Sequence, residues 1–157
     1  MTLFEQGVTG VLSMIHAHLT VTDAEKDNVI FGCRKLASEL EPEQRFTLPP
    51  EAIRGIRGII AGEPRLFSLE DQDAYWVCDG SAESFSFSDG ERHISLRCRN
   101  VWALPDEPEF RPFCQVLFPV WLNVCKVLLT NGVPERVLLL PDYAIVVLRE
   151  EPTGEKG

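Results

Sequence analysis

Phe85-Ser-Phe-Ser88, Asp89-Gly90 and His93-Ile-Ser-Leu-Arg97 follow one another in the stretch of sequence that decides the fold. Apolar and polar residues alternate on both sides of the Asp-Gly pair, as they do in strands that bury one face. Asp-Gly is typical of a tight hairpin turn, because both central residues of a type I′ turn have positive φ. The pattern therefore predicts an antiparallel hairpin.

A two-residue turn at Asp89-Gly90 would place Phe85 opposite Ile94 and Glu83 opposite Leu96. One face of the hairpin would then be apolar, with Phe85, Phe87, Ile94, Leu96 and Cys98. The other face would be polar and wet, with Ser84, Ser86, His93, Ser95 and Arg97. A second Asp-Gly pair, Asp79-Gly80, follows the strand-like residues 74–78, so we expect a three-stranded meander over residues 74–99.

The rest of the chain predicts an α+β fold around this meander. Apolar spacing favours N-terminal helices over residues 3–19 and 22–40, the second opened by a Thr22–Glu25 capping box, and a third helix over 50–61. A long helix over about 110–131 is apolar almost all round, and Pro119 is expected to kink or split it. Two apolar runs, 136–140 and 143–148, predict a C-terminal strand pair.

Length and composition indicate one ordinary globular domain. The chain has 157 residues, a net charge of −9 and five cysteines without Cys-x-x-Cys spacing. We expect a single domain over residues 1–149, a disordered acidic tail over 150–157, reduced cysteines and a cytoplasmic location. The acidic balance argues against nucleic acid and anionic membranes as partners, and polar residues within 113–129 favour a buried helix over a membrane span.

Catalytic and metal-binding patterns are weak. His16 and His18 would point apart on the helix expected there, so they could chelate one ion only on a strand. Ser86 and His93 would face each other across the hairpin, but no third group or Gly-x-Ser-x-Gly elbow accompanies them. The sequence therefore predicts no metal and no cofactor, and it favours a protein that is not an enzyme without deciding the point.

The first functional hypothesis is a non-catalytic protein-binding module, of the kind that neutralises a toxin (immunity-type) or inhibits an enzyme. Two acidic loops would face a basic partner, with Trp102 as the aromatic anchor. The predicted partner-binding residues are Glu70, Asp71, Asp73, Trp102, Asp106, Glu107 and Glu109.

The second hypothesis is a small-molecule-binding protein or enzyme with an anion site on the wet face of the meander. Its ligand-binding residues would be Ser86, His93, Arg97 and Arg99. A homo-oligomer held by the apolar run 137–148 is a third interpretation. A thermal-shift screen with anionic metabolites separates the second hypothesis from the first.

Overall fold

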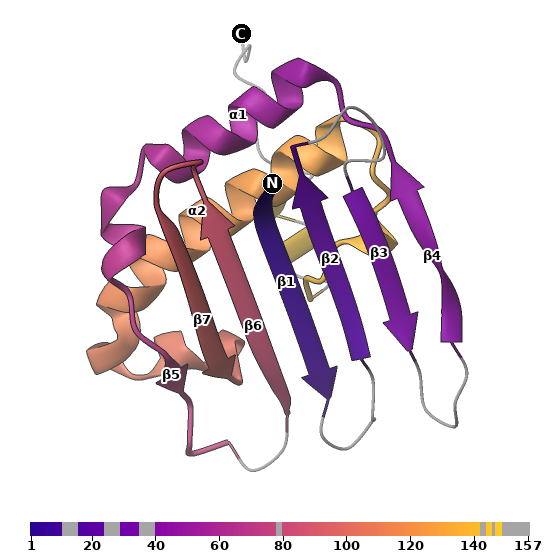
Figure 1. The fold of residues 1–157 in the computed structure, drawn as a ribbon. Helices are drawn as coiled ribbons and strands as arrows, with labels where there is room; N and C mark the ends of the chain where they lie inside the picture. The colour runs from indigo at the N-terminus through magenta and orange to yellow at the C-terminus, as the bar shows by residue number, and fades with distance from the viewer. Residues whose placement is uncertain are drawn as a thin grey trace, which may run out of the picture.

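A computed structural model describes residues 1–10, 16–23, 29–34, 40–77, 80–141, 144–145 and 147–148. These residues form a mixed α+β fold of two layers, a seven-stranded sheet with helices on one face (Figure 1). The strands are β1 (Thr2–Gly10), β2 (His16–Thr22), β3 (Val29–Arg34), β4 (Leu40–Phe46), β5 (Gln72–Asp73), β6 (Ser81–Ser88) and β7 (His93–Arg99). Their order is β4-β3-β2-β1-β6-β7-β5, and only β5 and β7 are paired in parallel within the described chain.

The helical layer covers the inner face of the sheet (Figure 1). It consists of α1 (Pro50–Ala61), α2 (Arg111–Thr130) and the 3-10 segments η2 (Pro64–Ser68), η3 (Val101–Asp106), η4 (Pro108–Phe110) and η5 (Glu135–Val137). The core lies between the layers, where Phe85 packs edge-on against Trp121 at 4.7 Å between ring centroids. The hydrophobic effect of this burial holds the helices on the sheet.

The predicted hairpin is confirmed as β6–β7, but its register differs by two residues. Phe85 lies opposite Leu96, and the last pair before the turn is Ser88–His93, so the loop contains four residues. The carboxylate of Asp89 accepts the backbone N–H groups of Glu91 and Arg92 and thereby stabilises the wider turn. An even shift keeps each side chain on its predicted face, because side chains alternate with period two.

The loop also docks the hairpin onto the helical layer. Asp89 accepts two hydrogen bonds from the Arg92 guanidinium, at 3.0 and 2.8 Å. Arg92 in turn lies 4.4 Å over the ring of Phe67 and donates to the carbonyl of Ala61 at 3.3 Å. Backbone N–H groups, those of Arg92 and Glu91 first, hold the pKa of Asp89 down at about 2.

We expect Asp89→Ala to lower the melting temperature by a few degrees, since the backbone N–H groups of Glu91 and Arg92 lose their carboxylate acceptor and Arg92 loses its ion pair. Asp89→Asn keeps an oxygen acceptor and should cost less. Because the pKa is depressed, the contribution of Asp89 is fully present above about pH 4 and is lost as the pH falls towards 2. Thermal unfolding monitored by circular dichroism checks both the effect of the substitutions and its pH dependence, with the exposed Glu91→Ala as control. Equal melting temperatures for Asp89→Ala, Asp89→Asn and Glu91→Ala would contradict the stabilising role of Asp89.

Two N-terminal helices were predicted, and within the described residues this is wrong. Residues 2–10, 16–22 and 29–34 are strands, which form an antiparallel meander with β4. The sequence His16-Ala-His-Leu-Thr-Val-Thr22 alternates strictly and is rich in β-branched residues, a strand signal that helical spacing of a few apolar residues obscured. Ala24 and Glu25 of the expected capping box lie outside the described residues.

The predicted third strand of the 74–99 meander is also wrong. Tyr75 and Trp76 form a turn, and the neighbour of β6 on its other side is β1 rather than residues 74–78. Ala74 is buried as expected, and Trp76 packs on Phe110 with 5.5 Å between ring centroids. Cys78 and Asp79 lie outside the described residues.

The helices predicted over 50–61 and 110–131 are confirmed as α1 and α2. Ile53, Ile56 and Ile60 of α1 are buried. Of the two outcomes expected at Pro119, a kink or a split, the split is wrong, because α2 runs as one element through Pro119. Proline lacks the backbone N–H that would donate to the carbonyl four residues earlier in the helix. Pro119 is exposed, so water can solvate that carbonyl instead.

No strand forms between residues 132 and 148 in the part that the structure describes, so the predicted C-terminal pair is wrong. Residues 144–145 and 147–148 are helical, and η5 precedes them. Central strands of the sheet already have neighbours on both sides, and this segment instead packs across the inner face. The side chains proposed for a subunit interface are mostly buried inside the chain itself: Val137, Leu138, Ile145 and Leu148. The tail 150–157 is outside the described residues.

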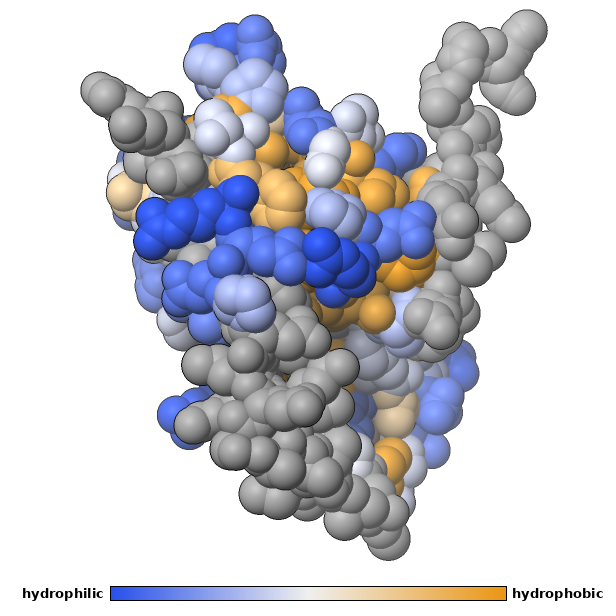
Figure 2. All heavy atoms as spheres, turned by 90° about the vertical axis from the view of Figure 1, so that its right-hand side faces the viewer, coloured by the Kyte–Doolittle hydropathy of each residue, from blue (hydrophilic) through white to orange (hydrophobic). Residues whose placement is uncertain are grey.

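The β4 edge is protected against further strand pairing. Pro42, Glu43 and Arg45 are exposed along it. Figure 2 looks onto this edge and shows a band of hydrophilic side chains across it. Proline and charge on an edge strand disfavour addition of another strand.

Candidate functional site

The outer face of the sheet is not covered by a helix of the described chain (Figure 1). This face carries a hollow of about 740 Å³. We call this hollow the open trough. Its outward-facing residues are Gly7, Thr9, His18, Ala82, Ser84, Arg97 and Arg99, with Asp71 and Asp73 at the rim. A volume of this order is typical of small-molecule sites.

Strand register places the trough residues in rows. Arg97 lies opposite Ser84, Ser84 opposite Gly7, and Gly7 opposite His18. A row of four strands spans roughly 14 Å from β7 to β2, since neighbouring strands lie about 4.7–4.9 Å apart. Small residues therefore form the floor of the trough, and two long side chains form its walls.

Gly7 makes the floor low. A Cβ atom built at Gly7 would lie 2.8 Å from the hydroxyl oxygen of Ser84, closer than side chains tolerate. Ala82 and Thr9, one row further along the strands, are opposite each other and exposed. The centre of the trough is thus polar backbone flanked by short side chains.

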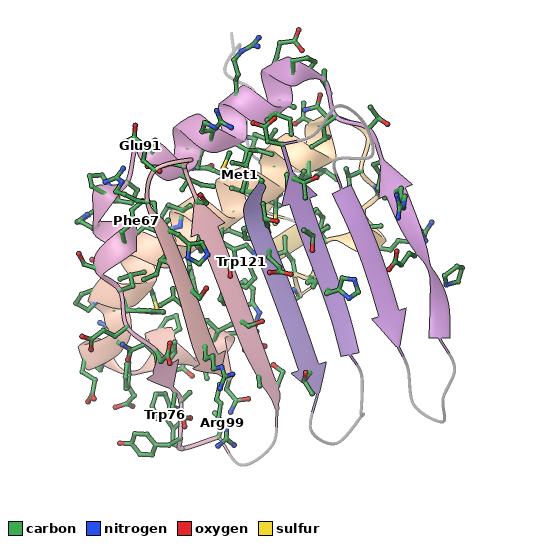
Figure 3. All side chains as sticks on the ribbon, in the orientation of Figure 1. Met1, Phe67, Trp76, Glu91, Arg99 and Trp121 are labelled. Carbon is green, nitrogen blue, oxygen red and sulfur yellow. The ribbon has the colours of Figure 1, made fainter. Side chains whose placement is uncertain are left out.

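Positive charge gathers on the β7 wall. Arg97 and Arg99 are both exposed, and Figure 3 shows Arg99 at the lower end of the sheet near Trp76. Arg99 pairs loosely with Asp73, at 3.9 Å. Within the described chain, the guanidinium of Arg97 has no ion-pair partner.

The rim carboxylates lie outside this wall, because β5 flanks β7 on the side away from β6. Asp71 accepts the backbone N–H of Arg97 at 2.9 Å and so occupies an edge position that a strand would otherwise fill. Asp71 therefore holds the backbone at Arg97, and the Arg97 side chain stays exposed beside the trough floor.

The ligand-binding residues predicted from sequence are only partly brought together. Arg97 and Arg99 line the trough. Ser86 faces Ser95 across the hairpin, with 3.1 Å between the hydroxyl oxygens. His93 is four residues from Arg97 along β7, roughly 13 Å at strand spacing, and pairs with Ser88 rather than Ser86.

The predicted acidic loops are exposed and lie on segments that contact each other, since β5 contacts η3. We call these carboxylates the acidic edge: Glu70, Asp71, Asp73, Asp106, Glu107 and Glu109. Trp102 is not their exposed anchor. It is half-buried, with its ring 4.7 Å from that of Trp121 and 5.2 Å from that of Phe118. The aromatic side chain exposed near this edge is Tyr75, at 75%.

Buried titratable groups serve the core rather than the trough. Glu83 points inward, accepts the backbone N–H of Val101 at 3.2 Å and is hydrogen-bonded to the Ser81 hydroxyl. Burial raises the pKa of this carboxyl despite both hydrogen bonds. Cys98, Cys114 and Cys125 are free and buried, and burial raises their pKa values to about 12, 11 and 12, which makes them poor nucleophiles.

The described residues contain no group of three or more histidine, cysteine or acidic side chains placed to hold a metal ion. His18 is exposed on β2, and the side chain of His16 is not described. Both histidines belong to strand β2 rather than to the helix expected from the sequence.

Gly7, Thr9 and His18 are not predicted as site residues from the sequence, because apolar spacing places them on a helix. Gln6 interrupts the apolar inner positions Phe4 and Val8, so β1 does not alternate in its sequence. The alternation of residues 16–22 was the available signal, and it would have put His18 on a polar sheet face.

Residues 108–130 are long and apolar enough to cross a membrane, but about half of that stretch is buried inside the fold. Among its helical positions, Gln115 and Asn123 are exposed. This pattern is consistent with a helix whose apolar face packs on the sheet.

Comparison with known proteins gives no relative from which to transfer an activity. No protein-family model matches the chain, and no curated protein matches it significantly. The candidate function therefore rests on the site alone.

Proposed function

We propose that this protein is a non-catalytic binding domain that holds a small anionic ligand in the open trough. The observation that carries the proposal is the exposed, unpaired guanidinium of Arg97 beside a floor of small residues, among the residues that the structure describes. Arginine binds carboxylates and phosphates through two parallel hydrogen bonds, so such a wall favours an anion.

Binding is favoured over catalysis by the spacing of the polar groups. Ser84 and His18 are separated by Gly7, which puts them roughly 10 Å apart, two strand spacings. A serine nucleophile needs its base within hydrogen-bond reach. The row therefore suits recognition of an extended ligand better than activation of the serine.

We expect a thermal-shift screen of anionic metabolites to raise the melting temperature, and Arg97→Ala to weaken binding of the hit at least tenfold. Loss of a charge-assisted pair costs about 1.5–3 kcal/mol, which corresponds to that factor. Titration calorimetry measures the affinity, and Arg54→Ala, an exposed arginine of α1, is the matched control. Unchanged affinity in Arg97→Ala, with the fold intact, would refute the proposal.

A second candidate is the protein-binding module, docking a basic partner at the acidic edge. Its specific support is the exposure of all six carboxylates beside Tyr75. Toxin neutralisation or enzyme inhibition would be its biological form. A stoichiometric partner in native purification, captured less well as salt rises, would favour this candidate, because salt screens such contacts. Absence of any stoichiometric partner would count against it.

A further inference from the structure

Resting on the proposed function, we infer that the ligand of the open trough is a free nucleoside monophosphate, with its phosphate at Arg97 and its base over Gly7 against His18. Three features of the trough suit this ligand: the charged wall, the flat floor and the aromatic far wall.

The phosphate end is set by how the two arginines are used. Asp73 lies on β5, outside β7, and is the partner of Arg99. Arg97 is left to face the floor, one strand from the Ser84 hydroxyl. A guanidinium with a neighbouring hydroxyl offers several donors to the oxygens of one phosphate group.

The floor suits a flat body. Gly7 has no side chain, and Ala82 and Ser84 beside it are small, so a planar ring can approach the peptide planes of β1 and β6. Any side chain at position 7 would occupy this space. A bulky or branched ligand would instead meet Thr9 at the next row.

The far wall is an imidazole. His18 is exposed directly opposite Gly7, and the residue opposite it on β3 is Gly32, which adds no side chain of its own. A histidine ring can hydrogen-bond to the edge of a nucleobase that lies on the floor. The strands that carry the two walls are roughly 14 Å apart. This distance is greater than the width of a phosphate group and comparable to the length of a nucleoside monophosphate.

The same chemistry occurs at the end of a nucleic acid strand, but the charge of the chain favours the free ligand. A net charge of −9 opposes a polyanion, since nucleic-acid binding depends on neutralising many phosphates. The acidic edge lies directly beyond the Arg97 wall, where a continuing strand would pass.

The test is titration calorimetry of the full chain with the four common nucleoside 5′-monophosphates, inorganic phosphate, adenosine and a single-stranded decanucleotide. We expect at least one monophosphate to bind more tightly than inorganic phosphate and the decanucleotide. His18→Ala should weaken binding of that monophosphate about tenfold, as expected for the loss of one hydrogen bond to the base, and should leave phosphate affinity unchanged. His93→Ala, an exposed histidine on the same face outside the trough, is the control.

Gly7→Ala should abolish monophosphate binding by filling the floor. Because its methyl group would crowd Ser84, the double variant Gly7→Ala/Ser84→Ala removes that contact and is compared with Ser84→Ala alone, which loses only the hydroxyl beside the phosphate; circular dichroism confirms the fold of each. If inorganic phosphate bound as tightly as every monophosphate and His18→Ala left all affinities unchanged, the ligand would not be a nucleotide, although an anion site at Arg97 would still be supported. Preference for the decanucleotide would also overturn it. If neither phosphate, nor monophosphates, nor any metabolite of the anionic panel bound, both proposals would fall.

Discussion

Gln6→Leu is expected to lower the free energy of unfolding by about 2–6 kcal/mol, although leucine is the more hydrophobic residue. Gln6 is fully buried on the inner face of β1. Its side-chain oxygen accepts the indole N–H of Trp121 at 3.1 Å, and its amide donates to the carbonyl of Leu139 at 3.0 Å. Leucine would leave the buried indole N–H and the half-buried Leu139 carbonyl without partners, at about 1–3 kcal/mol each.

Urea denaturation measures the change through the midpoint at unchanged slope. Gln115→Leu makes the same chemical change at an exposed position of α2 and should alter stability by no more than about 0.5 kcal/mol. A double-mutant cycle with Trp121→Phe isolates the indole bond. If Gln6→Leu were as stable as Gln115→Leu, Gln6 would not connect the layers as described.

This connection explains why the C-terminal apolar run is not a strand. The Leu139 carbonyl is satisfied by a side chain of the central strand rather than by a neighbouring backbone. Figure 3 shows Trp121 behind the sheet, in the layer that this segment shares. The run 136–148 carries the composition of a buried strand, and composition alone does not distinguish sheet from segments packed on it.

Local signals predicted what local physics decides. Asp89-Gly90 reverses the chain with Gly90 at φ 99°, and the faces of β6 and β7 follow from their alternation. The length of the loop was missed, because it depends on the Asp89 carboxylate holding two further N–H groups. Helices α1 and α2 likewise follow from their apolar spacing and their prolines and glycines.

The site depends on long-range pairing and could be predicted only in part. Arg97 and Arg99 were placed on a polar face from the hairpin alone. Their trough exists because β1 inserts between β2 and β6, a pairing of residues 4–10 with residues 81–87 that no local pattern specifies. Once His18 and Gly7 were assigned to a helix, no sequence argument could bring them beside Arg97.

Glu83 gives the second large expected effect. Glu83→Leu should lower the free energy of unfolding by about 1–3 kcal/mol, because the buried N–H of Val101 loses its acceptor. Glu83→Gln keeps one oxygen for that N–H group and an amide that can donate to the Ser81 hydroxyl. The glutamine variant should therefore fold like the wild type, and its comparison with the wild type isolates the charge.

The charge should make wild-type stability depend on pH in a direction opposite to that of Asp89. Burial raises the pKa of Glu83 from 4.5, so the folded state favours the protonated carboxyl. The stability that this protonated carboxyl contributes is fully present below pH 4.5 and is lost as the pH rises through the folded-state pKa. Glu83→Gln carries no charge, and its stability relative to the wild type should increase from about pH 4 upwards. Asp89 is common to both chains and cancels in the difference. Urea denaturation between about pH 4 and 8 measures this difference; a constant value would show that the buried carboxyl is not destabilised by ionisation.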